Sequence, residues 1–452
     1  MKFRISIFLL GILTFLFPSQ ITAQQSNSIT LDSVANGLQF RSIGPAFMSG
    51  RISDIEIHPH NENIWYIAVG SGGVWKTTNA GTTWTPIFDD QPSYSIGAIT
   101  LDSSNPNIVW VGSGEDSGGR HVGYGDGVYK SLDGGATWKN MGLKNSQHIS
   151  RILVHPENSD VVWVTAQGPL WNKGGERGLY KSIDGGKSWK KTLGDDQWTG
   201  VTEMVYNPEN PDRMYAATWQ RHRTVAAYIG NGPGTALYRS DDAGDTWEKL
   251  TNGLPETAMG KTGLAISPHD PNVLYAALEL DRRTGAVYRS DDGGSSWKKQ
   301  SNTVTGGTGP HYYQELFASP HQKDRLYLMD NTMQISEDGG KTFYRMNNKN
   351  KHGDNHAIAF KNNDPNYLLV GTDGGLYESF DLTASWKYIE NLPVTQFYKM
   401  AVDDEESFYN IYGGTQYNST ERGPSRTDKL HSIQNSDWSV VLNWDGHQPA
   451  TE

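Results

Sequence analysis

Short stretches in which apolar and polar residues alternate recur along the chain and predict β-strands. Ile55-Glu-Ile-His-Pro59 alternates in this way, and an Asn-containing turn separates it from the apolar run Trp65-Tyr-Ile-Ala-Val69. The same order returns at Leu264-Ala-Ile-Ser-Pro268 and Val273-Leu-Tyr-Ala-Ala277. A period of two residues bounded by turn-forming residues is typical of paired strands. Each such unit therefore begins with a predicted hairpin.

A second phrase, Ser-x-Asp-x-Gly-x-x-Trp, follows each predicted hairpin. Its seven copies, some with substitutions, occupy residues 77–84, 131–138, 182–189, 240–247, 290–297, 336–343 and 379–386. Ser and Asp side chains can hydrogen-bond within a tight turn, and glycine tolerates the positive φ that this turn needs. Because seven similar copies cannot all form one active site, we interpret the phrase, an Asp box, as structural.

The spacing of the phrase predicts the fold. The aromatic residues that end successive copies are 54, 51, 58, 50, 46 and 43 residues apart. About four short strands in each unit of this length indicate the blades of a β-propeller. We therefore predict an all-β protein whose residues 38–394 form a seven-bladed β-propeller with Asp-box repeats. Leu38-Gln-Phe-Arg41 could supply the strand that closes the seventh blade.

The C-terminal part departs from the repeat. Phe397-Tyr-Lys-Met-Ala-Val402 and Phe408-Tyr-Asn-Ile-Tyr412 resemble the start of an eighth unit, but no Asp box follows them. We predict that residues 395–452 are the incomplete start of a second propeller-like domain, and we expect the chain to be a fragment of a longer protein. The alternative is a structural tail packed on the ring.

The repeat also predicts which face of the propeller carries function. The turn between the first two strands of a unit and the Asp box must share one face, and the other connections must share the opposite face. The long insertions all belong to the second class, at 113–127, 166–177, 219–235, 279–286, 193–200, 251–261, 301–313 and 346–355. Lengthened loops on one rim of a rigid ring are where binding sites usually lie. This rim is called the loop face below.

Composition and the N-terminus restrict the class of protein. The chain has 452 residues, no Cys and a formal net charge of −11, which excludes a disulfide scaffold and argues against a nucleic-acid partner. Lys2 and Arg4 precede an apolar stretch from Ile5 to Phe17. This pattern predicts a signal peptide over 1–23, a linker over 24–37 and a secreted or periplasmic protein. The stretch is too short for a transmembrane span, although a short membrane anchor is the alternative.

The ends of the predicted inner strands supply candidate catalytic residues. The residues expected near the central channel are Ser71, Glu115, Gln167, Gln220, Glu279, Asp330, Asp373 and Gln416. The four carboxylates among them, Asp373, Asp330, Glu115 and Glu279, could act in pairs on a glycosidic bond. The alternative is that they merely line a wet, polar channel.

The loop face also offers candidate ligand-binding and metal-binding residues. Aromatic and basic residues gather in its insertions and suit a sugar ring that carries carboxylate or sulfate: Arg120, His121, Tyr124, Trp171, Trp219, Arg221, Arg223, Tyr312 and Tyr313. Ordinary loop packing is the alternative. His352, Asp354 and His356 alternate along one loop and could hold a structural metal ion or supply a base. No other cofactor is predicted.

Several phrases resemble a known family. Gly44-Pro-Ala-Phe-Met-Ser-Gly-Arg51, Gly70-Ser-Gly-Gly-Val-Trp-Lys76, Gly119-Arg-His-Val-Gly-Tyr-Gly-Asp126 and Gly413-Gly-Thr-Gln416 are similar to secreted bacterial sortilin-like proteins with bacterial-neuraminidase repeats. The resemblance implies tandem propellers of glycosyl-hydrolase-like ancestry.

More distantly, Thr372-Asp373-Gly-Gly-Leu-Tyr377 is similar to the catalytic phrase of glycoside hydrolase family 74 xyloglucanases. The first-blade equivalent, Gly70-Ser-Gly-Gly-Val-Trp-Lys76, lacks that Asp, and Phe40-Arg-Ser-Ile-Gly-Pro45 matches the sialidase phrase poorly. We therefore expect a protein that binds or cleaves a polysaccharide at the loop face, and not a sialidase. The alternative is a non-catalytic propeller scaffold that binds peptides or proteins.

Overall fold

The computed structural model describes residues 41–44, 50–117, 119, 122–194, 197–281, 284–303, 315–416 and 418–451. The predicted signal peptide over 1–23, the linker over 24–37 and all of the predicted closing strand except Arg41 lie outside these residues. The chain divides into two compact units, Met1–Ser42 and Ile43–Glu452, and all of the sheets belong to the second.

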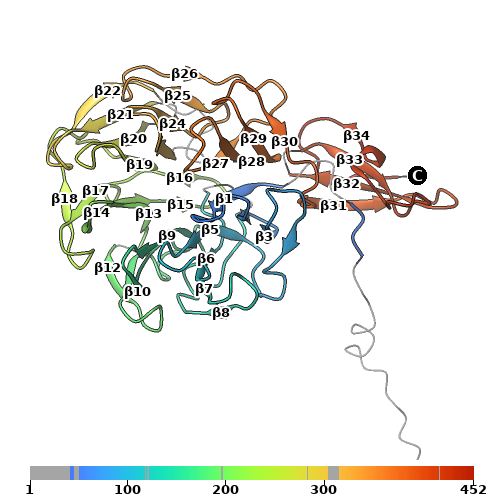
Figure 1. The fold of residues 1–452 in the computed structure, drawn as a ribbon, viewed down its shortest axis with the longest axis horizontal. Coiled ribbons are helices and arrows are strands. Elements are labelled where there is room, and N and C mark those ends of the chain that lie inside the picture. The colour runs from blue at the N-terminus through green and yellow to red at the C-terminus, as the bar shows by residue number, and fades with distance from the viewer. Residues whose placement is uncertain are drawn as a thin grey trace, which may run out of the picture. The chain divides into compact units, whose positions relative to one another are not determined.

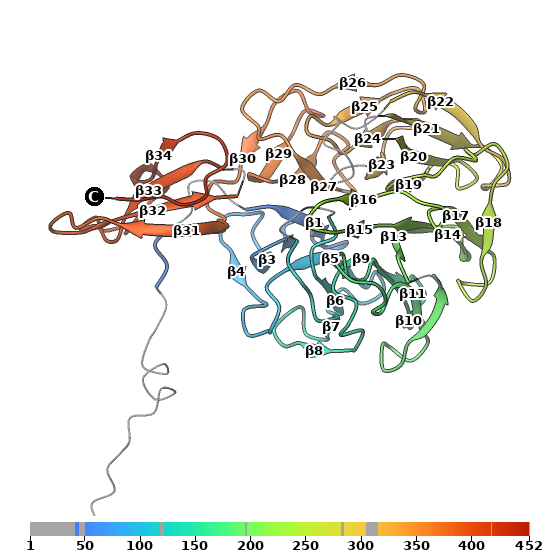
Figure 2. The same cartoon turned by 180° about the vertical axis from the view of Figure 1, so that it is seen from behind.

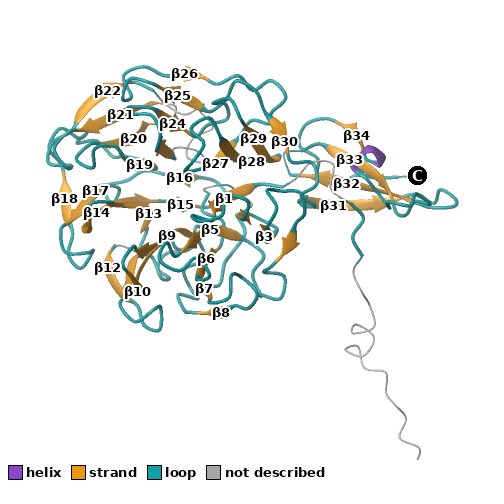
Figure 3. Cartoon of the chain, viewed as in Figure 1, coloured by secondary structure: helices purple, strands orange, loops and turns teal. Residues whose placement is uncertain are grey.

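Eight four-stranded antiparallel sheets follow one another in the described residues (Figures 1 and 3). The first sheet contains β1 (Ile52–Ile57), β2 (Trp65–Val69), β3 (Gly73–Thr77) and β4 (Thr85–Pro86), and the second contains β5 (Ile96–Leu101), β6 (Val109–Ser113), β7 (Val128–Ser131) and β8 (Lys139–Asn140). The third sheet contains β9 (Ile149–His155), β10 (Asn158–Ala166), β11 (Gly178–Ser182) and β12 (Lys190–Leu193), and the fourth contains β13 (Thr199–Asn207), β14 (Asn210–Gln220), β17 (Leu237–Ser240) and β18 (Glu248–Leu250). A small hairpin of β15 (His222–Arg223) and β16 (Tyr228–Ile229) is inserted in the fourth sheet.

The remaining sheets repeat the same sequential strand order. The fifth sheet contains β19 (Thr262–Ile266), β20 (Leu274–Asp281), β21 (Thr284–Ser290) and β22 (Lys298–Ser301), and the sixth contains β23 (Leu316–Ala318), β24 (Leu326–Leu328), β25 (Gln334–Ser336) and β26 (Tyr344–Arg345). The seventh sheet contains β27 (Asn355–Phe360), β28 (Leu368–Thr372), β29 (Gly375–Ser379) and β30 (Lys387–Tyr388), and the C-terminal sheet contains β31 (Phe397–Val402), β32 (Asn410–Thr415), β33 (Thr420–Pro424) and β34 (Ser439–Leu442). The one helix described is the short 3₁₀ turn η1 (Asn435–Asp437), so the all-β prediction is confirmed. No helix in the described part of the chain is long and apolar enough to cross a membrane.

The first strands of the first seven sheets surround one central cavity. Residues from β1, β5, β9, β13, β19, β23 and β27 line this cavity, whose volume is about 550 Å³. The first and seventh sheets are also in contact, because Gly50 N donates to Val394 O at 2.8 Å and Trp84 Nε1 donates to Asn391 Oδ1 at 3.3 Å. Figure 2 shows these strands from behind. The sheets therefore have a propeller-type arrangement.

The repeated turn joins the third and fourth strands of each of these seven sheets. In the second sheet, Ser131 Oγ accepts a hydrogen bond from Gly135 N at 2.8 Å and donates to Asp133 Oδ1 at 2.7 Å. Equivalent bonds recur in the other six copies. Trp138 Nε1 then donates to Ile87 O of the preceding sheet at 2.6 Å. The Ser and Asp side chains of the phrase are thus engaged in holding the turn.

Candidate functional site

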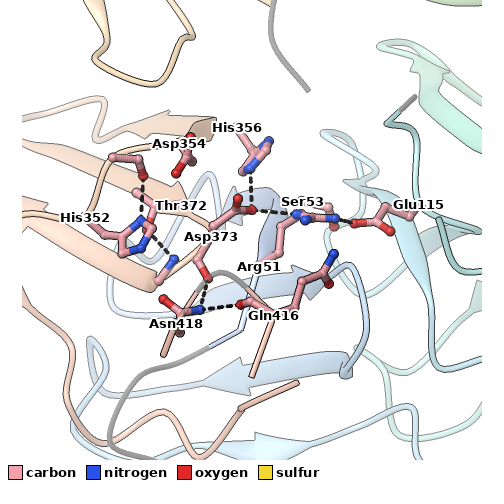
Figure 4. Close-up of polar contacts among 12 residues, drawn as sticks. Arg51, Ser53, Glu115, His352, Asp354, His356, Thr372, Asp373, Gln416 and Asn418 are labelled. Carbon is pink, nitrogen blue, oxygen red and sulfur yellow. Dashed lines mark hydrogen bonds and ion pairs between the residues drawn. The ribbon is translucent and has the colours of Figure 1, made fainter. Parts of the chain in front are cut away.

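Four ionisable side chains meet at the loop-face end of the central cavity (Figure 4). Arg51 precedes β1, Glu115 follows β6 and Asp373 follows β28, whereas His356 lies within β27. All four are at least nine-tenths buried: 5% of Arg51, 2% of Glu115, 7% of His356 and 2% of Asp373 is exposed. The antiparallel order of the strands brings these positions to the same rim, as the sequence predicts for Glu115 and Asp373.

Arg51 bridges the two carboxylates. Its Nε donates to Asp373 Oδ1 at 2.6 Å, and its Nη1 is paired with Glu115 Oε1. His356 Nε2 lies 2.8 Å from the same oxygen of Asp373. Burial alone raises the pKa of Asp373, but the charges and hydrogen bonds of Arg51 and His356 outweigh burial and hold that pKa well below its ordinary value. Asp373 is therefore an oriented, ionised carboxylate.

A second group of charges comes from the third to the sixth sheets. Lys261 Nζ is 2.7 Å from Glu315 Oε1, and Arg151 Nε is 3.2 Å from Glu203 Oε2. Asp116, next to Glu115, is half-buried and interacts with both pairs. Burial raises the pKa of Asp116 to about 7, because the repulsion from Glu315 adds to burial and Lys261 offsets only part of it. Asp116 and Asp373 therefore differ strongly in their tendency to hold a proton.

The structure brings together only two of the four predicted catalytic carboxylates, Asp373 and Glu115. The Asp330 carboxylate instead accepts hydrogen bonds from two nearby residues of its own loop and strand, Asn331 N at 2.7 Å and Gln334 Nε2 at 2.8 Å. Glu279 is half-buried in the fifth sheet, where its side chain lies against Gly260. These two residues belong to the sixth and fifth sheets, whereas the Arg51 cluster is built by the first, second and seventh sheets.

The predicted aromatic and basic platform is only partly on the surface. Tyr124 and Trp171 are 62% and 36% exposed, but Trp219, Arg221 and Arg223 are buried, contrary to the prediction that they face a ligand. Backbone carbonyl groups in the loop insertions need hydrogen-bond donors, and two of these side chains provide them. Arg221 Nη1 donates to Ser117 O at 2.8 Å, and Trp219 Nε1 donates to Gly230 O at 2.8 Å. Arg223 lies over the Tyr228 ring. Arg120, His121, Tyr312 and Tyr313 lie outside the described residues.

The predicted metal ligands do not converge on one point. His356 contacts Asp373, Asp354 Oδ1 accepts a hydrogen bond from Asn331 Nδ2 at 2.8 Å, and His352 Nδ1 lies 2.9 Å from Gly353 O. Among the described residues, no group of three or more His, Asp or Glu side chains is arranged to hold a metal ion. The three side chains thus have separate contacts, and Asp354, with a positive φ of 55°, lies between the two histidines of the loop.

Three residues of the site were missed from the sequence. Arg51 stands in one of the family-like phrases, and a lone Arg before the first inner strand could have indicated a partner for the strand-end carboxylates. Asp116 directly follows a predicted strand end and could have been included with Glu115. Asn418, whose Nδ2 donates to Asp373 O at 2.9 Å, comes from the C-terminal sheet and carried no local signal.

The fold and these groups define a propeller-type protein with a buried carboxylate–arginine cluster at one end of its ring. The sequence model of the Sortilin-Vps10 family, described as "Sortilin, neurotensin receptor 3", matches residues 126–281 and 285–439, more than half of the chain. The chain belongs to this family.

Two curated relatives and one solved structure illustrate the similarity. The oligoxyloglucan-reducing end-specific xyloglucanase of Emericella nidulans is 22% identical over 44% of this chain and 24% of the relative, so the chain matches about a quarter of that protein's length. The dispase autolysis-inducing protein of Streptomyces mobaraensis is 30% identical to this chain over a region that covers 46% of this chain and 73% of the relative. The GH74 xyloglucanase from Xanthomonas campestris superposes with a TM-score of 0.63 at 16% identity, over 84% of this chain and 60% of that one, which shows a shared fold. The chain thus has a propeller-type fold like that of the xyloglucanase structure and is distantly similar in sequence to xyloglucanases.

Proposed function

We propose that this protein is an exported glycoside hydrolase that binds a polysaccharide on the loop face and cleaves it beside Asp373. The ionised state and orientation of Asp373, held by Arg51 and His356, carry the proposal. Asp373 also lies in the phrase that resembles the catalytic phrase of the xyloglucanases, and xyloglucanases are among the relatives of this chain. Xyloglucan is therefore the first substrate to test.

The proposed chemistry divides the work between two carboxyl groups. Asp373, kept ionised, acts as the base that activates water or stabilises positive charge on the sugar. Asp116, with a pKa of about 7, acts as the acid that protonates the leaving oxygen. Environments that push two carboxyl pKa values apart are typical of such acid–base pairs.

The same proposal includes the domain organisation. We propose that the seven sheets from β1 to β30 are the seven blades of one propeller, and that β31–β34 form the start of a second propeller-like domain. The shared central cavity and the contacts between the first and seventh sheets support a closed ring of seven. A signal peptide over 1–23 would direct the protein outside the cytoplasm.

The testing experiment incubates the purified chain with soluble xyloglucan, a β-glucan, a mannan and a polyuronate. New reducing ends report cleavage, and retardation in polysaccharide-containing gels reports binding. Asp90→Asn, a substitution at an exposed residue, is the surface control. Cleavage of at least one polysaccharide supports the proposal. Retardation without cleavage would show that the protein binds polysaccharide but does not hydrolyse it. If neither cleavage nor retardation is observed, the proposal is rejected.

The pH profile provides a further prediction. Because Asp116 must hold a proton to act as the acid, the cleavage rate should fall as pH rises above about 7. The ionisation of Asp373, whose pKa is depressed, should limit the rate only at strongly acidic pH. Asp116→Asn should lower the rate and remove the alkaline limb. If the variant keeps the wild-type rate and profile, Asp116 is not the acid.

One observation favours a second candidate function, a scaffold that binds a basic peptide in the central cavity. Asp54, Glu56 and Glu203 line this cavity with Arg151, so its described lining carries more carboxyl groups than cationic side chains. The family description names a neurotensin receptor. Binding of a Lys/Arg-rich peptide by a chain that neither cleaves nor retains any polysaccharide would favour this function.

A further inference from the structure

A second pocket lies next to Asp373, between the seventh sheet and the C-terminal sheet. Its volume is about 440 Å³, within the range of small-molecule sites. Tyr377 of β29 and Tyr388 of β30 form one side, and Asn435 of η1 reaches it from the C-terminal sheet. Gly374, the residue after Asp373, also lines the pocket and lies against the His352 ring. The pocket therefore adjoins the proposed catalytic carboxylate.

The pocket combines aromatic surface with neutral hydrogen-bonding groups. The Tyr377 and Tyr388 rings have centroids 5.1 Å apart. Asn350 and Asn435 contribute amides, and Asn435 Nδ2 donates to Glu390 O at 2.5 Å. The Oδ1 of Asn435 is shielded from solvent and has no hydrogen-bond partner among the described residues. Such an acceptor is satisfied by a hydroxyl donor.

The one lysine at the pocket is already engaged. Lys351 Nζ donates to His352 O at 3.1 Å and is paired with Asn355 Oδ1. It also lies 5.4 Å from the centre of the Tyr377 ring and 5.2 Å from that of Trp386. Burial lowers the pKa of Lys351 to about 7, which further weakens its positive charge at neutral pH. Glu390, in contrast, is an exposed carboxylate at the pocket.

We propose that this pocket is a saccharide subsite that takes sugar rings of a neutral polysaccharide, stacked on Tyr388 and hydrogen-bonded to Asn435. A sugar ring offers an apolar face to an aromatic side chain and hydroxyls to amides. The engaged lysine and the exposed carboxylate disfavour a uronic acid or a sulfated sugar. The subsite rests on the proposed function, since it would hold the chain that Asp373 cleaves.

The experiment measures retardation by xyloglucan for the wild-type chain, Tyr388→Ala and Asn435→Ala. Tyr344→Ala is the matched control, because Tyr344 lies on β26, the corresponding outer strand of the sixth sheet, and is 48% exposed. We expect about fivefold weaker binding for each pocket variant, as for the loss of one aromatic or hydrogen-bonding contact, and no change for the control. Circular dichroism confirms that each variant is folded.

The outcomes separate the subsite from the function. If the wild-type chain is retarded by xyloglucan and both folded pocket variants bind as tightly as it does, the subsite is rejected while the proposed function stands. If the wild-type chain prefers a polyuronate, the neutral-sugar assignment is rejected. If it binds no polysaccharide, the proposed function itself has failed. Should Tyr388→Ala unfold, Asn435→Ala alone decides, because Asn435 is in a surface turn and its loss leaves the ring's strands intact.

Discussion

Replacing Asp373 by Asn is expected to lower the rate of polysaccharide cleavage by about 10²- to 10⁴-fold, the usual contribution of a positioned acid–base group. The amide has the shape of the carboxylate but cannot accept a proton or stabilise positive charge. Arg51 keeps its pairing with Glu115, so the ring should remain folded. The initial rate of reducing-end formation measures the effect.

Two comparisons make this result specific to Asp373. Asp330→Asn changes a buried carboxylate at a strand end of the sixth sheet, where it accepts hydrogen bonds from Asn331 N and Gln334 Nε2, and it should alter the rate by less than about threefold. Gel retardation by the uncleaved polysaccharide should be similar for wild type and Asp373→Asn. A rate within threefold of wild type for Asp373→Asn would exclude Asp373 from the chemistry.

Replacing Arg51 by Met is expected to lower the free energy of unfolding by about 3–5 kcal/mol, because removing one partner leaves buried charges uncompensated. Arg51 is the cation paired with both Asp373 and Glu115, and only 5% of it is exposed. Urea-induced unfolding followed by Trp fluorescence measures the change. Arg239→Met is the matched control: Arg239 also pairs with two carboxylates, Asp241 and Glu248, but these are exposed, so the loss should be below about 1 kcal/mol.

The pH dependence of the difference in free energy of unfolding between wild type and Arg51→Met identifies the cause of that difference. The pKa of Asp373 is depressed in the folded wild type, so the stability it contributes is present above its unfolded pKa of about 3.9 and is lost as pH falls through the folded value. The variant lacks this contribution. The gap between wild type and Arg51→Met should therefore be largest near neutral pH and narrow in acid. A gap that does not change with pH would indicate a packing defect instead.

The sequence by itself determined the strands, the turns and their repetition, because these depend on local chemistry. Alternation at Ile55-Glu-Ile-His-Pro59 predicted β1, and the Ser131 and Asp133 side chains bond within their own turn. The order of strands within a sheet follows from short connections, so the rim that carries Asp373 and Glu115 could also be predicted. These are properties of segments of ten residues or fewer.

The tertiary structure alone decided which side chains meet. Arg51 is 322 residues from Asp373 and 64 from Glu115 in the chain, and the packing of the first, second and seventh sheets brings all three together. Arg221 and Arg223 are buried among the loops instead of facing solvent. Asp354 has a positive φ and does not contact the same groups as His352 and His356. Local patterns specify where a strand ends, but the direction and protonation of a side chain depend on charges and carbonyls contributed by other sheets.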